Sequence, residues 1–241
     1  MNAASADTQH TGEPPTPPSR ARAAVVRDAL GVGLAVGLSG FAFGATAAGA
    51  GFGVPQACAL SLLVFTGASQ FALVGALGAG ANPLAAVAGA FFLGVRNAFY
   101  GLRLSQLLRL PRGLRPLAAH WVIDETSAVA LAQPDRSAAR LGFTVTGVSL
   151  YALWNLTTLA GALGASALGD PAAWGLNAAG PAVFLALLAP MVRSGGRERA
   201  TAALAVLLVL VAVPLLPAGV PVLVAALAAP LVMLVRRGTE A

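Results

Sequence analysis

The polar residues best able to do chemistry in this sequence lie inside apolar runs. Thr66, Gly67, Ala68, Ser69 and Gln70 stand together in the middle of one such run. A buried hydroxyl can bond to a carbonyl one helical turn earlier, but the Gln70 amide has no such simple local partner. Gly67 would allow the helix to unwind, and unwound backbone offers donors and acceptors to an amino-acid zwitterion or an ion. We therefore predict a helix break and a substrate-binding site at these residues, with the Ser69 and Gln70 side chains lining a cavity.

Arg96 and Asn97 form a second polar group, and Asp124 and Glu125 form a third. An arginine deep in an apolar helix costs about 2.5–3.5 kcal/mol on insertion scales. Arg96 could extend to a membrane surface together with Arg103, but we expect it to pair with one of the two carboxylates. Such a pair would neutralise the charge, so we predict a gating or charge-pairing role for these groups. The alternative for the carboxylates is the surface of an amphipathic helix.

A fourth polar group surrounds Asn155 in a later apolar run, with Trp154, Thr157 and Thr158 beside it. Hydrogen bonds between helices are the first interpretation of this group, and lining of a transport path is the alternative. Enzyme signatures are not found. With two histidines, the single Cys58 and no lysine, we expect no His/Cys metal cluster, no Cys–His couple and no phosphate loop ending in lysine. We therefore predict no catalysis, no metal and no cofactor.

The composition indicates what surrounds these groups. Hydrophobic residues make up 57% of the 241 residues and charged residues 10%, and the mean hydropathy is +0.78. A soluble domain carries about 25% charged residues, so this chain is predicted to face a lipid bilayer. Every cation is an arginine, and most arginines lie between apolar runs. That placement is typical of cytoplasmic loops and does not favour a nucleic-acid binder.

Membrane helices must therefore position the polar groups. A helix of about 20 apolar residues crosses the hydrocarbon core. On that criterion we predict an all-α helical membrane bundle with about seven segments, some broken or re-entrant: 29–49, 56–79, 83–102, 141–163, 172–192, 200–216 and 219–235. Residues 116–132 fit an interfacial helix, a re-entrant hairpin or a broken crossing. A single permease domain (28–237) is expected between a disordered cytoplasmic tail (1–27) and a short C-terminal tail (238–241).

The arginines also bear on topology. Arginine-bearing loops at 133–140 and 193–199 alternate with arginine-free turns, which places the C-terminus in the cytoplasm. In the first half, three full crossings would put Arg103 and its neighbours outside, so either one segment is re-entrant, or 116–132 crosses, or the N-terminal tail is outside. Glycine pairs spaced by four residues, Gly33/Gly37 and Gly40/Gly44, predict close helix packing within the bundle.

Four stretches of the sequence resemble the AzlC family: GLSGFAFGATAAGAGF, LSLLVFTGASQFAL, FFLGVRNAFYGLRLS and VIDETSAVA. The resemblance covers roughly residues 29–235 and is most specific at Gly67–Phe71, at Arg96 and at Asp124–Glu125. Members of this family are the large subunits of bacterial branched-chain amino-acid exporters. Asn97 stands where the family usually has a histidine, which argues against a proton relay at that position.

The resemblance implies a secondary active transporter that exports branched-chain or similar hydrophobic amino acids across the bacterial cytoplasmic membrane, driven by an ion gradient. It also implies a small, separately encoded membrane subunit of the AzlD type as a partner. A membrane scaffold subunit that holds no substrate site is the alternative, and a passive channel is a third one. Buried charge pairing favours the transporter, since a scaffold has no need of it.

Overall fold

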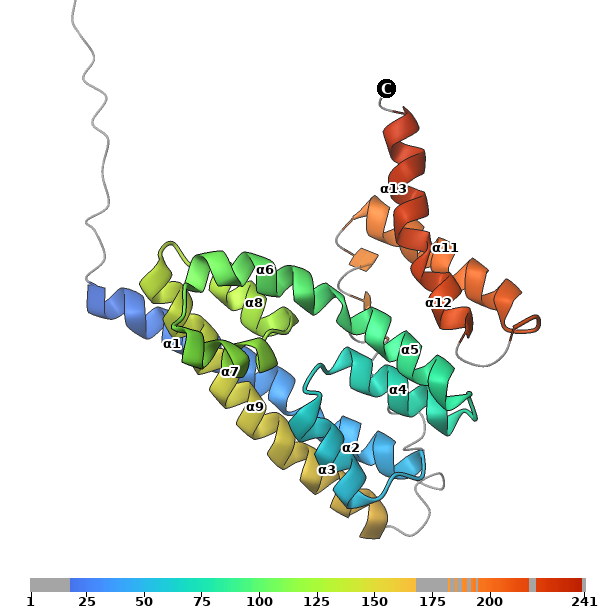
Figure 1. Cartoon of the computed structure of the whole chain (residues 1–241), viewed down its shortest axis with the longest axis horizontal. Coiled ribbons are helices and arrows are strands. Elements are labelled where there is room, and N and C mark those ends of the chain that lie inside the picture. Colours follow the sequence, from blue (N-terminus) through green and yellow to red (C-terminus); the bar gives the residue numbers. More distant parts are fainter. Residues whose placement is uncertain are drawn as a thin grey trace, which may run out of the picture.

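The computed structural model describes residues 18–167, 195–216 and 220–239, together with residues 182, 185, 188, 189, 192 and 193. Within these residues the chain is helical and contains no strand, which confirms the predicted all-α bundle (Figure 1). In chain order the helices are α1 (Pro18–Gly37), α2 (Gly40–Gly49), α3 (Val54–Leu63), α4 (Ala68–Gly78), α5 (Pro83–Gly94), α6 (Arg96–Leu108), the short η1 (Arg112–Leu114), α7 (Arg115–His120), α8 (Asp124–Leu131), α9 (Arg136–Ala167), α11 (Gly196–Ala212), α12 (Val220–Ala226) and α13 (Ala228–Thr239).

The described residues include helices that suit a membrane. Three helical stretches are long and apolar enough to cross one, namely Arg22–Gly49 (α1 with α2), Pro83–Leu108 (α5 with α6) and Arg136–Ala167 (α9). Each of them contains one of the predicted segments. Shorter apolar helices are Val54–Leu63, Ala68–Gly78 and Val224–Val235. The chain is therefore a multi-pass helical membrane protein.

One predicted boundary differs from the structure, and one of the alternatives for residues 116–132 is excluded. α1 begins at Pro18, inside the predicted tail of residues 1–27, because arginine side chains can extend to water while the backbone stays helical. Residues 116–132 do not cross a membrane, since α7 has 6 residues and α8 has 8, whereas a crossing needs about 20. The predicted segment at 172–192 lies mostly outside the described residues, and so do residues 217–218 between the last two predicted segments.

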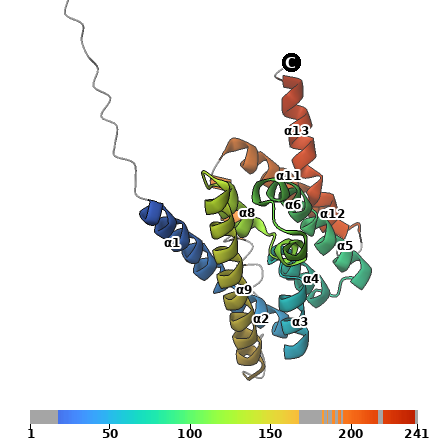
Figure 2. The ribbon, with the colours of Figure 1, turned by 60° about the vertical axis from the view of Figure 1, so that its left-hand side comes forward.

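The long helix α9 is the axis of the bundle, and α1 and α2 pack along it (Figure 1, Figure 2). Gly33 lies against Ser149 near one end of this contact. Gly44 lies against Ala162 near the other. The two stretches are therefore parallel, and α1 and α9 begin at the same end of the bundle. A Cβ atom at either glycine would clash with α9, so the predicted glycine spacing does permit close packing.

α3 and α4 form a re-entrant hairpin, which we call the first hairpin (residues 54–78). α3 follows the end of α2 after a short turn, and Gly78 at the end of α4 lies against Ala50 at the end of α2. Both ends of the hairpin are thus at one end of the bundle. The arginine distribution left open whether one of the first three predicted segments is re-entrant. This geometry favours that alternative, because α5 and α6 then return the chain, with Arg103, to the end where α1 and α9 begin.

α7 and α8 form a second hairpin (residues 115–131), which enters from that opposite end. Near the end of α8, Val129 lies against Gly142 in the first part of α9. At the turn between α7 and α8, Trp121 packs against Gly147, farther along α9. The second hairpin therefore extends toward the middle of the bundle and comes back.

The tips of the two hairpins meet on α9. The ring of Phe65 in the first hairpin lies 6.0 Å, centroid to centroid, from that of His120 in the second. Tyr151 of α9 contacts both, at 4.8 Å from Phe65 and 5.5 Å from His120. Edge-to-face contacts of this kind add about 0.5–1.5 kcal/mol each beyond area burial. An aromatic cluster thus fixes the level at which the two hairpins meet.

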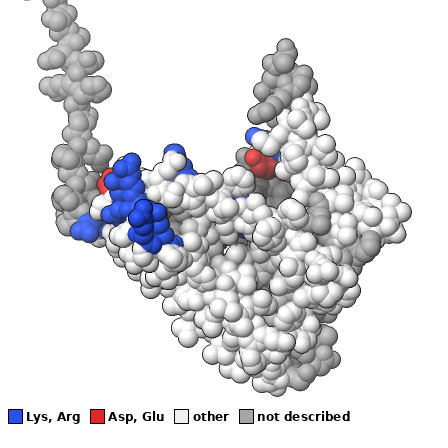
Figure 3. Space-filling view, viewed as in Figure 1, with Lys and Arg blue, Asp and Glu red and all other residues white. Residues whose placement is uncertain are grey.

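Arginine side chains fasten the end of α6 to the start of α9. Arg136 donates from Nε to the Leu107 carbonyl at 3.1 Å, and Arg140 donates to the carbonyls of Leu108 at 2.7 Å and Arg109 at 2.8 Å. These bonds satisfy carbonyls that a helix end leaves without intrahelical partners. Figure 3 shows most of the visible arginine atoms gathered on this side of the molecule.

The close packing of α2 against α9 can be tested by adding one methyl group at a glycine of α9. A Cβ atom at Gly161 of α9 would clash with the backbone of Phe41, and overpacking costs about 1–3 kcal/mol. Gly161→Ala should therefore lower the midpoint of thermal unfolding in detergent, measured as loss of the monodisperse peak in size-exclusion chromatography. Gly164→Ala is the matched control, since its Cβ would have only ordinary contact with Phe41 at 3.9 Å. Equal midpoints for the two variants would contradict this packing.

Candidate functional site

The predicted break in the second apolar run is present at the tip of the first hairpin. α3 ends at Leu63 and α4 begins at Ala68. Phe65 has φ of 39° and Gly67 has φ of 58°. Such angles are uncommon for a residue with a side chain and are open to glycine. The chain therefore turns here through non-helical residues, as the sequence predicts, although the break begins before Thr66.

Gln70 stabilises this break instead of lining a cavity. Its Oε1 accepts from the backbone N–H groups of Thr66 at 3.2 Å and Gly67 at 3.0 Å. Its Nε2 donates to the Leu60 carbonyl at 2.9 Å, and the side chain is fully buried. Gln70 therefore does not line the cavity as predicted, because the break frees two backbone N–H groups from which its amide oxygen accepts.

Ser69 also points elsewhere than predicted. Its side chain is buried and faces Gly94 on α5. A Cβ atom added at Gly94 would lie 3.5 Å from the Ser69 hydroxyl, an ordinary van der Waals contact. The hydroxyl does not line the cavity at the hairpin tips. Successive side chains on a helix point about 100° apart. The exact residue at which α4 begins therefore decides which of residues 66–70 face the cavity.

The cavity at the hairpin tips, which we call the central cavity, has a volume of about 430 Å³. Its polar lining comes from Thr66, Gly67, Arg96, Asp124 and Glu125, together with Ser39. Three of the predicted groups therefore meet at one place, and Ala68 joins them at the start of α4. The apolar lining comes from Val36, Phe65, Phe71, Leu93, Ile123, Leu150, Trp154 and Leu188.

Arg96 and Asp124 form the ion pair that the sequence predicts. Arg96 Nη2 lies 2.7 Å from Asp124 Oδ2, and each side chain is 38% exposed. The pair joins the start of α6 to the start of α8. Glu125, next to it in the first turn of α8, makes no ion pair within the described residues. Both carboxylates line the central cavity, which differs from the amphipathic surface helix of the alternative.

Several buried polar atoms in the residues around the central cavity have no hydrogen-bond partner. They are the Thr66 hydroxyl, Arg96 Nε, Asp124 Oδ1 and the indole Nε1 of Trp154. An unpaired buried polar group costs about 1–3 kcal/mol. This set contains both donors and an acceptor, so it suits a ligand that carries a group of each kind. The sequence interpretation gave the group around Trp154 hydrogen bonds between helices first and path lining second; Trp154 lines the central cavity, and its indole N–H has no partner.

The two asparagines lie away from this cavity. Asn97 lines a separate cavity beyond the ion pair. Asn155 donates from Nδ2 to the Tyr151 carbonyl within α9, at 2.8 Å, and lines neither cavity. Its neighbour Thr157 does bond between helices, to the Gly37 carbonyl at 2.7 Å. Within the described residues, no group of three or more His, Cys, Asp or Glu side chains could hold a metal ion.

The role of Gln70 generates a stability prediction. Gln70→Leu removes three hydrogen bonds and leaves the part-buried N–H groups of Thr66 and Gly67 without a partner, at about 1–3 kcal/mol each. Its thermal midpoint in detergent should fall well below that of Gln133→Leu, which loses a single bond to the Val129 carbonyl. If the two variants melt together, Gln70 does not hold the break.

Comparisons with known proteins identify the family of this chain. The chain matches the AzlC protein family over residues 31–168, which is more than half of its length. It is 32% identical over 156 residues to the inner membrane protein YgaZ of Escherichia coli K12, covering 61% of this chain and 64% of that protein. It is also 32% identical over 128 residues to an uncharacterized membrane protein of Archaeoglobus fulgidus, covering 53% of this chain and 55% of that one.

The chain thus spans less than two thirds of the length of these curated relatives. No solved structure matches it. The family match covers both hairpins, α9 and every residue that lines the central cavity except Leu188. On this evidence the chain belongs to the AzlC family of membrane proteins.

Proposed function

We propose that this protein is a secondary active transporter that exports branched-chain or similar hydrophobic amino acids across the cytoplasmic membrane. The observation that supports it best is the central cavity, where unpaired donors and an acceptor meet apolar walls. Its volume of about 430 Å³ is within the usual range for a small-molecule site, about 300–1,000 Å³. An amino acid with an apolar side chain has the matching groups.

The donors suit the carboxylate of such a substrate. Thr66 and Arg96 Nε are free to donate, and the N-terminus of α4 begins at the cavity with Ala68. First-turn amides and the helix dipole favour a negative group at that place. A broken helix that presents its N-terminus to a substrate carboxylate is a known solution in transporters.

The acceptors suit the ammonium group. Asp124 Oδ1 has no partner, because only Oδ2 is used by Arg96. Glu125 lies beside it and also lines the cavity. Arg96 and Asp124 neutralise each other, so the substrate meets local partners of each sign instead of a large net charge. A zwitterion therefore finds partners for both its carboxylate and its ammonium group in this cavity.

The apolar walls set the selectivity. Phe65, Leu93 and Leu150 are among the residues that would contact an aliphatic side chain. Apolar walls discriminate one methylene by only about 1–3 kcal/mol. Leucine, isoleucine, valine and methionine should therefore all be carried, with modest differences between them.

A small AzlD-like membrane subunit and an ion gradient complete the proposal. The surface of α5 and α6 is consistent with a membrane partner, because large apolar side chains are exposed on it. The exposed fractions are 69% for Phe91, 63% for Phe92, 67% for Phe99 and 67% for Leu102. Either lipid or a second membrane protein can cover such a surface. A scaffold subunit would need the same surface but not the polar cavity. The positive-inside bias places the arginine-rich end and the C-terminus in the cytoplasm.

The direct test is efflux of radiolabelled leucine, isoleucine, valine and methionine from cells. Cells that make this chain together with its small subunit should lose the preloaded amino acids faster than cells that lack the chain. A chain that assembles with the subunit and changes no amino-acid flux would be a scaffold, and the proposal would be wrong.

Two hydroxyl deletions distinguish the cavity from its surroundings. Thr66→Val removes a donor from the central cavity and should lower leucine efflux roughly tenfold or more, as expected for a hydrogen bond to a charged group. Ser69→Ala removes a buried hydroxyl three residues away that does not line the cavity, and efflux should persist. Both variants should reach the membrane in equal amounts, checked by immunoblot. Loss of efflux in Ser69→Ala alone would move the site to the other face of α4.

A further inference from the structure

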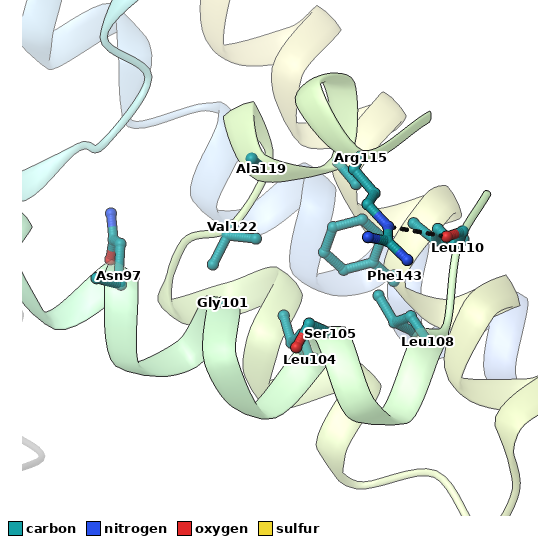
Figure 4. Close-up of a pocket in the computed structure, with 12 residues that line it drawn as sticks. Asn97, Gly101, Leu104, Ser105, Leu108, Leu110, Arg115, Ala119, Val122 and Phe143 are labelled. Carbon is teal, nitrogen blue, oxygen red and sulfur yellow. Dashed lines mark hydrogen bonds between the residues drawn. The ribbon is translucent and has the colours of Figure 1, made fainter. Parts of the chain in front are cut away.

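A second cavity lies on the other side of the Arg96–Asp124 pair. Its volume is about 550 Å³, and it is lined by residues of α6, by α7 with the residues after it, and by Phe143 of α9. Figure 4 shows Asn97 at one end of this cavity and Arg115 at the other, with Val122 and the α6 side chains between them. We call it the vestibule.

The outer end of the vestibule lies at the arginine-rich end of the bundle. Arg115 is exposed and donates from Nε to the Leu110 carbonyl at 3.2 Å. Leu108, which also lines the vestibule, accepts from Arg140. The positive-inside bias assigns this end to the cytoplasm. The vestibule therefore begins where a cytoplasmic solute would first meet the protein.

The inner end of the vestibule reaches the wall of the central cavity. Asn97 lines the vestibule and Arg96, the preceding residue, lines the central cavity. On the facing hairpin, Val122 lines the vestibule whereas Ile123 and Asp124 line the central cavity. Neighbouring residues thus face different cavities on both sides, and the 2.7 Å ion pair joins the two sides of this wall.

The lining of the vestibule suits the same kind of molecule as the central cavity. Leu104, Leu108 and Phe143 provide apolar walls, and Asn97 Oδ1 is a buried acceptor without a partner at the inner end. An ammonium group leading an apolar side chain would find both. We propose that the vestibule is the cytoplasmic entry site for the hydrophobic amino acid, and that the Arg96–Asp124 pair closes the passage from it to the central cavity. The identity of the substrate in this assignment rests on the proposed transport function, whereas the path between the two cavities does not.

Cysteine accessibility tests the path without any substrate. In a Cys58→Ala chain, Ala68→Cys puts one thiol on the central cavity. Inside-out membrane vesicles then present the cytoplasmic face to a small, charged, membrane-impermeant methanethiosulfonate reagent. Asp124→Asn breaks the ion pair and should speed modification of this thiol by a factor of about 5 or more, a typical coupling between two sites. Arg96→Gln opens the same pair and replaces Asp124→Asn if that variant is not monodisperse.

A plug in the vestibule completes the experiment. Gly101 lines the vestibule, and a side chain there would meet no atom within 4 Å of its Cβ. Gly101→Leu, added to the opened chain, should return the modification rate to that of the closed chain. Gly75→Leu is the matched control, because Gly75 has equal space and lines neither cavity; the rate should stay high.

Two results would overturn the proposal. If neither Asp124→Asn nor Arg96→Gln raises the rate, the ion pair does not close the passage. If Gly101→Leu leaves the raised rate unchanged, reagent enters by another route, and the vestibule holds something else, such as a lipid chain. Failure of the transport proposal is a separate observation, since the wild-type chain would then show no amino-acid efflux whatever the thiol reactions show.

Discussion

A helix that breaks inside a membrane must find partners for its freed backbone groups, because no bulk water is there to supply them. In this protein the break lies between α3 and α4, and the fully buried Gln70 accepts from the N–H groups of Thr66 and Gly67 and donates to the Leu60 carbonyl. Since these bonds satisfy the break from within the chain, the first hairpin can turn back instead of crossing. The direction of α5 and α6, and with it the position of Arg96, depends on that turn.

The second requirement is a surface on which two hairpins from opposite ends can meet. α9 provides it. On one side, glycines let α1 and α2 lie so close to α9 that a Cβ atom would clash. On another side, Tyr151 and Trp154 project large rings into the hairpin tips, where they contact Phe65 and Phe71. Close backbone packing and aromatic packing therefore lie on different sides of one helix, and Leu150 and Trp154 of α9 line the central cavity.

Charge is placed where the two hairpins face α6. The side chains of Arg96 and Asp124 are each 38% exposed, so water or a ligand can approach the pair, whereas its Nε and Oδ1 atoms are buried and have no hydrogen-bond partner. Dry, fully bonded pairs have little to offer a ligand. The Arg96–Asp124 pair uses one bond to hold α6 and α8 together and leaves one donor and one acceptor unpaired. It can therefore exchange its own contact for contacts with a substrate. That chemistry underlies both the proposed binding site and the proposed closure.

The sequence alone determined the class of the protein, the break near Gly67 and the pairing of Arg96 with a carboxylate. Each follows from a local energetic demand: 10% charge cannot cover a soluble surface, glycine permits a positive φ, and a deep arginine needs a partner. The tertiary structure alone decided that the first hairpin is re-entrant, that Gln70 serves the backbone, and that Asn97 and Arg96 face different cavities. These depend on which neighbour each side chain meets. Adjacent residues on a helix point about 100° apart, so composition and spacing place a residue at a level in the bundle, and only packing against α9 and the hairpins decides its direction.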